Sequence, residues 1–153
     1  MTTHFHSTAR RSRLVALAMI LSGGCVVPTE TTPVPNVPAS FSGRPVVVQG
    51  EITVARPNVT IYVWDSGVVD GDIISLSVNG NWITQNRTLT ANKVAIPVTL
   101  NSKGYSYLLL YAVNEGSIPP NTAAISIDDG TGEQLLTLSA NLSTNAALNI
   151  RIR

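Results

Sequence analysis

The chain has 153 residues, a formal net charge of +1, and a composition that is 44% hydrophobic and only 12% charged. This length is sufficient for one domain with a substantial core, and a single cysteine excludes an intrachain disulfide. Basic residues do not cluster after residue 24. Nucleic-acid binding is therefore not expected, because neutralising phosphate groups requires a basic face.

The first 24 residues have the features of a secretory signal peptide. Three arginines within residues 10–13 precede an apolar run at 14–21, which is much shorter than the roughly 20 residues of a membrane-spanning helix. Small residues then lead to Cys25, the only cysteine in the chain. The pattern predicts a signal peptide at residues 1–24.

Residues 21–25, LSGGC, resemble the lipobox of bacterial lipoproteins, although the usual leucine lies four positions before the cysteine rather than three. The resemblance implies cleavage before Cys25, attachment of diacylglycerol to its thiol, and acylation of the new amino terminus, as with palmitate. Two or more acyl chains hold a protein on a membrane. The absence of an aspartate after Cys25 implies the outer membrane of the cell envelope, and leaves open which side the domain faces. An ordinary secretory signal with a chance cysteine is the alternative.

Residues 25–45 are rich in proline and threonine and are predicted to form a lipidated linker. The prolines stand at positions 28, 33, 35, 38 and 45. Such a segment favours extended polyproline geometry of about 3.1 Å per residue, so it could span roughly 50 Å. The folded domain is predicted to occupy residues 46–153.

From residue 46 the hydrophobic pattern changes to the period of two that is typical of β-strands. Residues 59–64 alternate, with Val59, Ile61 and Val63 on one face and Trp64 on the other. Asn79-Gly80 lies between two strand-like runs and predicts a hairpin turn, because both residues accept positive φ. Further strands are expected at 46–54, 73–78, 94–100, 105–113, 122–128, 134–140 and 146–152.

About eight short strands without helical periodicity predict an all-β domain, and an antiparallel β-sandwich is the expected architecture. A small closed β-barrel is the alternative. Pro97 cannot donate a hydrogen bond to a neighbouring strand, so residues 94–100 are expected at a sheet edge or at a bulge. Residues 105–113 are apolar on both faces and are expected in the middle of a sheet.

The predicted mature domain contains no histidine, since His4 and His6 both lie in the signal peptide, and its one thiol is predicted to be acylated. Histidine- and cysteine-dependent catalysis and zinc binding are therefore not expected. A pair of carboxylates could still hydrolyse a glycoside, but a domain of this size leaves little room for a deep cleft. The chain is predicted not to be an enzyme.

Two groups of aspartates are candidate metal ligands. Asp65, Asp70 and Asp72 fall within eight positions, and Asp128 and Asp129 directly precede a glycine. Calcium prefers six to eight oxygen ligands, which carboxylates on β-sandwich loops can supply. The interpretation is one Ca²⁺ site that joins these loops. Turn formation is the alternative, because Asp-Gly pairs are frequent in tight turns.

Trp64 and Trp82 are candidate ligand contacts, since an exposed row of aromatic rings can stack on sugar rings. Trp64 is expected to be the more exposed, because it lies opposite three apolar residues of its strand. Tyr107 and Tyr111 alternate with Leu109 and are expected to be buried. Burial of most of these rings in the core or against a sheet is the alternative.

Two longer stretches, VVDGDIISLSVNGNW and NEGSIPPNTA, resemble a small module found in secreted and surface proteins of many bacteria. The similarity covers roughly residues 58–152. It implies a β fold and a location at the cell surface, and it implies no particular biochemical activity. Asn114, Glu115 and Asn121 belong to the second stretch and are candidate partner contacts. The loop that carries them is expected to pack against the loop at 65–72.

These features favour a membrane-anchored envelope lipoprotein that acts as a structural or protein-interaction module. Its expected partners are the lipid membrane, through Cys25, and another envelope protein. The contact surface would be the edge strand that bears Pro97, or the loop at 114–121. The alternative function is a carbohydrate-binding module for cell-wall glycan, which would depend on calcium or on an aromatic platform.

Overall fold

The computed structural model of this protein describes Met1 and residues 36–153. The predicted signal peptide, the acylation site at Cys25 and most of the predicted linker lie outside the described residues. Within residues 36–153 the chain forms ten strands and no helix. The strands are β1 (Ser40–Phe41), β2 (Arg44–Val54), β3 (Asn58–Trp64), β4 (Ile73–Val78), β5 (Asn81–Thr88), β6 (Val94–Thr99), β7 (Gly104–Ala112), β8 (Asn121–Asp128), β9 (Glu133–Ala140) and β10 (Asn145–Ile152).

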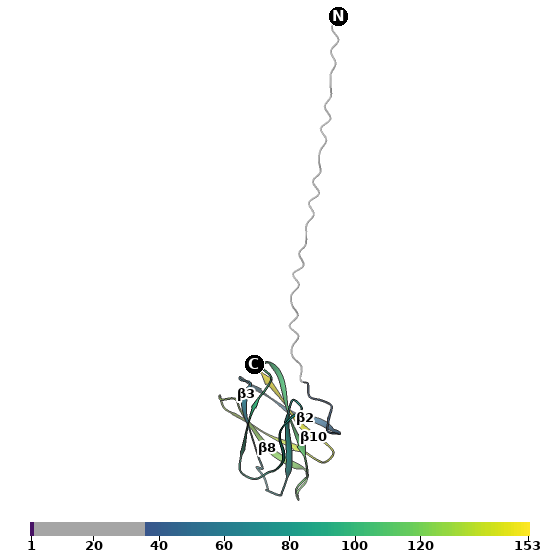
Figure 1. The fold of residues 1–153 in the computed structure, drawn as a ribbon, viewed down its shortest axis with the longest axis vertical. Coiled ribbons are helices and arrows are strands. Elements are labelled where there is room, and N and C mark those ends of the chain that lie inside the picture. The colour runs from purple at the N-terminus through teal and green to yellow at the C-terminus, as the bar shows by residue number, and fades with distance from the viewer. Residues whose placement is uncertain (2–35) are drawn as a thin grey trace. The chain divides into compact units, whose positions relative to one another are not determined.

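The strands are arranged in two sheets, which Figure 1 shows as the two layers of the domain. One sheet has six strands in the order β1-β2-β10-β7-β4-β5, and the other has four in the order β6-β3-β8-β9. Neighbouring strands are antiparallel except β2 and β10, which run parallel with Ala146 opposite Val47. The predicted β-sandwich is confirmed, and the alternative closed barrel is not formed because the strands divide between two sheets.

The folded domain begins earlier than the sequence indicates. β1 and the first residues of β2 lie in the segment that was expected to be linker. Ser42 and Gly43 turn the chain between them with positive φ angles of 48° and 79°. The side chain of Asn145 then donates a hydrogen bond of 2.8 Å to the carbonyl of Phe41. This long-range bond fixes a short strand that local sequence pattern alone could not reveal.

Local predictions that rest on backbone chemistry are confirmed. Asn79 and Gly80 form the turn between β4 and β5, with φ angles of 50° and 83°. Pro97 lies on β6, which is an edge strand of the four-stranded sheet. β7 lies between β10 and β4, in the interior of the six-stranded sheet. Asn79 and Gly80 accept positive φ, which the turn requires. Pro97 cannot donate a hydrogen bond to a neighbouring strand, which suits an edge. β7 is apolar on both faces, which suits the interior of a sheet.

The core lies between the two sheets and takes alternate residues from each strand. Ile61 of β3 and Ile125 of β8 face it from the four-stranded sheet. Leu76, Leu110 and Leu148 face it from the six-stranded sheet. All five side chains are buried. Because burial of apolar surface contributes about 25 cal/mol per Å², this layer is the main source of the domain's stability.

The six-stranded sheet curls, and aromatic side chains cover its concave outer face. Phe41 of β1 and Trp82 of β5 come from opposite edges of this sheet, yet their ring centroids are 5.1 Å apart. Tyr111 lies 6.0 Å from Trp82, and the guanidinium of Arg44 lies 4.0 Å from the Tyr111 centroid. Leu109, two residues before Tyr111 on β7, is fully buried although it is not part of the main core. The aromatic cluster is therefore a second, smaller core that joins the two edges.

Leu110→Ala should lower the free energy of unfolding by about 2–5 kcal/mol, because it leaves a cavity between the sheets. Leu135→Ala is the matched control, since Leu110 is 0% exposed and Leu135 is 68% exposed. The control should change stability by less than about 0.5 kcal/mol. Urea unfolding of both variants measures the difference, and equal losses would contradict the placement of the core.

Candidate functional site

Two loops meet at one end of the sandwich. Residues 65–72 connect β3 to β4, and residues 113–120 connect β7 to β8. The amide of Val113 donates a hydrogen bond of 2.8 Å to the carbonyl of Ile73. The amide of Ile118 donates one of 2.7 Å to Oδ2 of Asp70. The expected packing of the second loop against the first is therefore confirmed.

The side chains of two asparagines join these loops by hydrogen bonds. Asn114 accepts a hydrogen bond of 2.6 Å from the amide of Ile73 and donates one of 2.9 Å to the carbonyl of Gly71. Asn121 is fully buried and donates to the carbonyls of Ile73 and Asn114. The prediction of Asn121 as a partner contact is therefore wrong, because the residue is 0% exposed and a partner protein cannot reach it.

Glu115 is half-buried and also has an internal partner. Its Oε1 accepts a hydrogen bond of 3.2 Å from the amide of Leu142, in the turn that joins β9 to β10. This bond brings a third connection to the same end of the sandwich. Leu142 itself is exposed.

Three carboxylates of the first loop converge. One oxygen atom from each of Asp65, Asp70 and Asp72 lies within 4.8 Å of those of the other two, so the group could hold a metal ion. Each carboxylate is positioned by a backbone amide. Gly67 donates to Oδ1 of Asp65, Ile118 to Oδ2 of Asp70 and Thr122 to Oδ2 of Asp72, at 2.7–3.0 Å. The second oxygen of each carboxylate has no hydrogen-bond partner among residues 36–153.

Asp72 is the most constrained member of the group. It is only 4% exposed, and its Oδ1 is buried without a hydrogen-bond partner in the described part of the chain. Burial raises the pKa of Asp72, as do the negative charges of Asp70, Asp65 and Glu115, while the amide of Thr122 lowers it. A positively charged ligand would offset both the burial and the repulsion.

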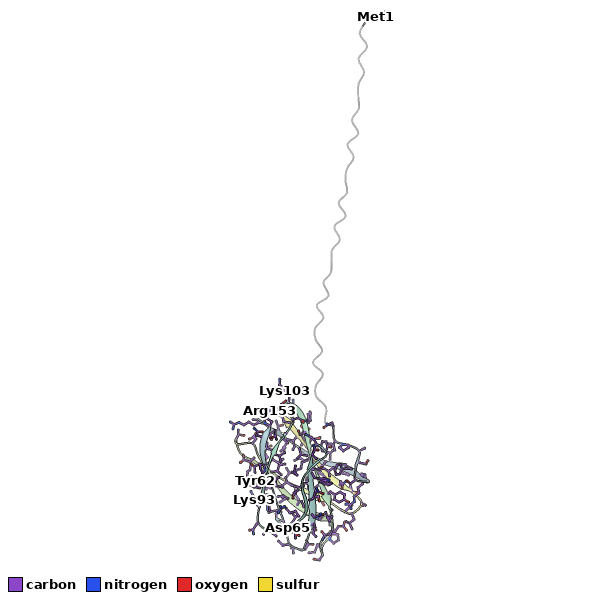
Figure 2. All side chains as sticks on the ribbon, in the orientation of Figure 1. Met1, Tyr62, Asp65, Lys93, Lys103 and Arg153 are labelled. Atoms are coloured by element: carbon purple, nitrogen blue, oxygen red, sulfur yellow. The ribbon has the colours of Figure 1, made fainter. Side chains whose placement is uncertain are left out.

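The carboxylates form the polar part of a pocket of about 250 Å³. Val68, Ile118 and Pro120 supply apolar walls. All three are exposed at the surface, Val68 to 69% and Ile118 to 58%. Figure 2 shows Asp65 near the lower end of the domain, away from Lys103 and Arg153 at the upper end. The sequence analysis did not predict these walls. The signal that could have revealed them is the presence of apolar residues inside two otherwise polar loops.

Asp128 and Asp129 do not join this group, so the predicted site of five carboxylates is wrong. Thr122, near the start of β8, contacts Asp72, whereas Asp128 ends the same strand. A strand of eight residues separates its ends by roughly 23 Å at about 3.3 Å per residue. Asp129 instead accepts hydrogen bonds from the amides of Ala55 and Thr131.

The tryptophans do not form an open stacking platform. Trp64 is half-buried, and Nζ of Lys93 lies 4.7 Å from its ring centroid and 5.4 Å from that of Tyr62. Lys93 is held there by an ion pair of 2.7 Å with Glu133. Trp82 is 38% exposed and is part of the aromatic cluster with Phe41 and Tyr111. Trp82 is therefore the more exposed of the two, and the expectation that Trp64 would be more exposed is wrong.

The two tyrosines of β7 lie on its outer face. Tyr107 is buried, as the alternation with Leu109 predicted, and Tyr111 is half-buried beneath the guanidinium of Arg44. Burial also raises the pKa of Tyr107. Both rings are therefore part of the packing of the sheet, although the expected burial of Tyr111 is only partial.

No protein-family model, curated protein or solved structure matches this chain. In the part of the chain that the structure describes, no helix has the length and apolar character of a membrane span. The chemistry of the pocket is then the guide to function.

Asp129 should make the stability of the domain depend on pH. Hydrogen bonds from the Thr131 side chain and the Ala55 amide lower the pKa of Asp129 below its unfolded-state value. Its ionised form therefore stabilises the fold above the unfolded pKa, and this contribution is lost as the pH falls through the folded pKa. Asp129→Asn should lower the melting temperature at pH 7, and the difference from the native chain should shrink in acid.

Asp128→Asn is the matched control for this measurement, because it removes the same charge one position earlier. Asp128 accepts one hydrogen bond, from the amide of Gly130, so the control should lose less stability at pH 7. Thermal unfolding followed by circular dichroism between pH 7 and acid provides the comparison. A deficit of Asp129→Asn that stays constant with pH would contradict the expected role of its charge.

Proposed function

We propose that this chain is a lipid-anchored protein of the bacterial envelope whose β-sandwich is a protein-interaction module. The LSGGC segment and the proline-rich residues that follow it support the anchor. The observation that carries the interaction role is the acidic pocket with exposed apolar walls at the loop end of the domain.

Exposed aliphatic side chains gather at this end. Val68 and Val69 come from the first loop, Ile118 from the second, and Leu142 from the turn that Glu115 contacts. Single exposed apolar residues are ordinary, but a group of them around a polar centre is typical of a protein-binding surface. We therefore assign the partner contact to this end, which we call the loop surface (residues 65–72, 113–120 and 141–144).

The strand edges of the four-stranded sheet are less suitable as contact surfaces. Pro97 removes a donor from the edge of β6. On the opposite edge, the side chain of Gln49 bonds both the carbonyl and the amide of Ser139 in β9, at 2.7 and 2.9 Å. Both features block the addition of another strand, because such pairing needs free backbone groups.

Calcium-dependent binding of cell-wall glycan is the second candidate function. It is favoured by the convergence of Asp65, Asp70 and Asp72, which each place one oxygen within 4.8 Å of the other two, since Ca²⁺ prefers carboxylate oxygens. Three such ligands would leave several coordination positions for sugar hydroxyls. Aromatic stacking would contribute little, because the rings of Trp64 and Tyr62 lie under Lys93.

Cys25→Ala should release the protein from the membrane, because the thiol that would carry the diacylglycerol is then absent. The native protein should fractionate with membranes and incorporate labelled palmitate, and the variant should do neither. An unlabelled native protein that is secreted in soluble form would instead support the ordinary signal peptide.

Ile118→Asp should abolish in-cell crosslinking to a specific envelope protein, because it places a charge on the apolar part of the loop surface. Leu135→Asp is the matched control, since Leu135 is similarly exposed but lies on β9. Crosslinked products are identified by mass spectrometry of the full-length lipoprotein. A partner captured equally by both variants would contradict the assignment of the loop surface.

Calcium binding is measured by isothermal titration calorimetry of the full-length protein. If the second candidate function holds, Asp72→Asn should weaken Ca²⁺ binding by at least about tenfold, a change of 1.4 kcal/mol. Asp128→Asn should leave it unchanged, since Asp128 lies at the other end of β8. The absence of binding heat at millimolar Ca²⁺ would exclude this candidate.

A further inference from the structure

The pocket on the loop surface holds negative charge that the domain itself does not neutralise. The ion pair formed by the described residues joins Lys93 to Glu133 and does not involve the pocket. Asp72 is only 4% exposed, and its Oδ1 has no hydrogen-bond partner within residues 36–153. A buried carboxylate oxygen without a donor is costly, so the pocket is complementary to a cation that also donates hydrogen bonds.

The apolar walls of the pocket indicate that the ligand also has an apolar part. Val68, Ile118 and Pro120 surround the approach to the carboxylates with apolar surface. A bare metal ion would make no use of these walls. A lysine side chain would, because its four methylene groups pack on apolar surface while its ammonium group reaches a polar site. The volume of about 250 Å³ is sufficient for one such side chain.

The arrangement of the oxygens favours an ammonium group over a guanidinium group. An ammonium group has three N–H donors in tetrahedral directions. At donor–acceptor distances of about 2.8 Å its three acceptors lie roughly 4.6 Å apart. One oxygen from each aspartate lies within 4.8 Å of the other two, so the three carboxylates are close enough to accept from one ammonium group. A guanidinium group instead presents a planar fork that suits both oxygens of one carboxylate.

We propose that this pocket binds the side chain of a lysine from a partner protein, with the ammonium group on Asp65, Asp70 and Asp72. The aliphatic part of the lysine packs on Val68, Ile118 and Pro120. This inference rests on the proposed function, because the lysine belongs to the protein that the loop surface contacts. It adds the chemistry of the contact and names the residue type that the partner contributes.

The test uses the full-length protein, labelled with ¹⁵N and held in detergent. The probe is Nα-acetyl-lysine methylamide, and chemical-shift changes are followed at the amides of Gly67, Ile118 and Thr122. These amides donate to the three carboxylates, so they report directly on occupation of the pocket. Saturable shifts at all three amides are expected.

Two matched probes separate the contributions of charge and shape. The norleucine analogue keeps the aliphatic chain without the ammonium group and should bind at least about tenfold more weakly. The arginine analogue should also bind more weakly than lysine. Equal binding of norleucine would overturn the role of the carboxylates, and tighter binding of arginine would overturn the preference for an ammonium group.

Variants of the protein complete the test. Asp72→Asn and, as a second variant, Asp70→Asn should each weaken lysine binding at least about tenfold, whereas Asp128→Asn should not. Ile118→Ser should weaken binding of lysine but not of Ca²⁺, because only lysine uses the apolar wall. Shifts caused by Ca²⁺ with none caused by the lysine probe would overturn the proposal in favour of a metal site.

The proposal and the proposed function can fail separately. If crosslinking captures a partner through the loop surface but the lysine probe does not bind, the lysine contact is overturned and the interaction role stands. If the crosslinked partner is lost on substitution of its contacting lysine by methionine, both are supported. If the lysine probe binds but no protein is captured, the interaction role fails and the pocket is a site for small amines.

Discussion

The pocket depends on the backbone of Ile73, at the start of β4. Its amide donates to the side chain of Asn114, and its carbonyl accepts from the amide of Val113 and the side chain of Asn121. These bonds fix the loop after β7 against the loop before β4. Without them the carboxylates of Asp70 and Asp72 would lose the amides that position them, and the apolar walls would not lie beside the acidic group.

The same arrangement places charges where they are costly. Asp72 lies in a desolvated position beside two further carboxylates, and its pKa is raised for both reasons. Elsewhere in the domain a charge has a partner of opposite sign, as in the exposed ion pair between Lys93 and Glu133. Carboxylates whose pKa is perturbed by burial and by neighbouring charges are found preferentially at functional sites. The proposed functions both follow from this contrast.

Most of the fold could be predicted from local chemistry, while the composition of the site could not. Alternating residues in β3, the Asn79-Gly80 turn and the proline of β6 each act over a few positions, and each was interpreted correctly. The two groups of aspartates were wrongly combined, because the sequence around Asp128 and Asp129 does not show which end of the sandwich they occupy. β1 was missed because two of its contacts are made by distant residues, Trp82 and Asn145, with its residue Phe41.

The sequence by itself determined most of the strand segments, the Asn79-Gly80 turn, and that residues 36–153 contain carboxylates but no histidine or cysteine. These properties follow from side-chain periodicity, from the backbone freedom of glycine and asparagine, and from composition. Only the tertiary structure decided which loops share an end of the sandwich, which aspartates meet, and which aromatic rings are covered. The physical reason is that strand order and direction bring distant residues together, and burial then determines which of their polar atoms remain unpaired.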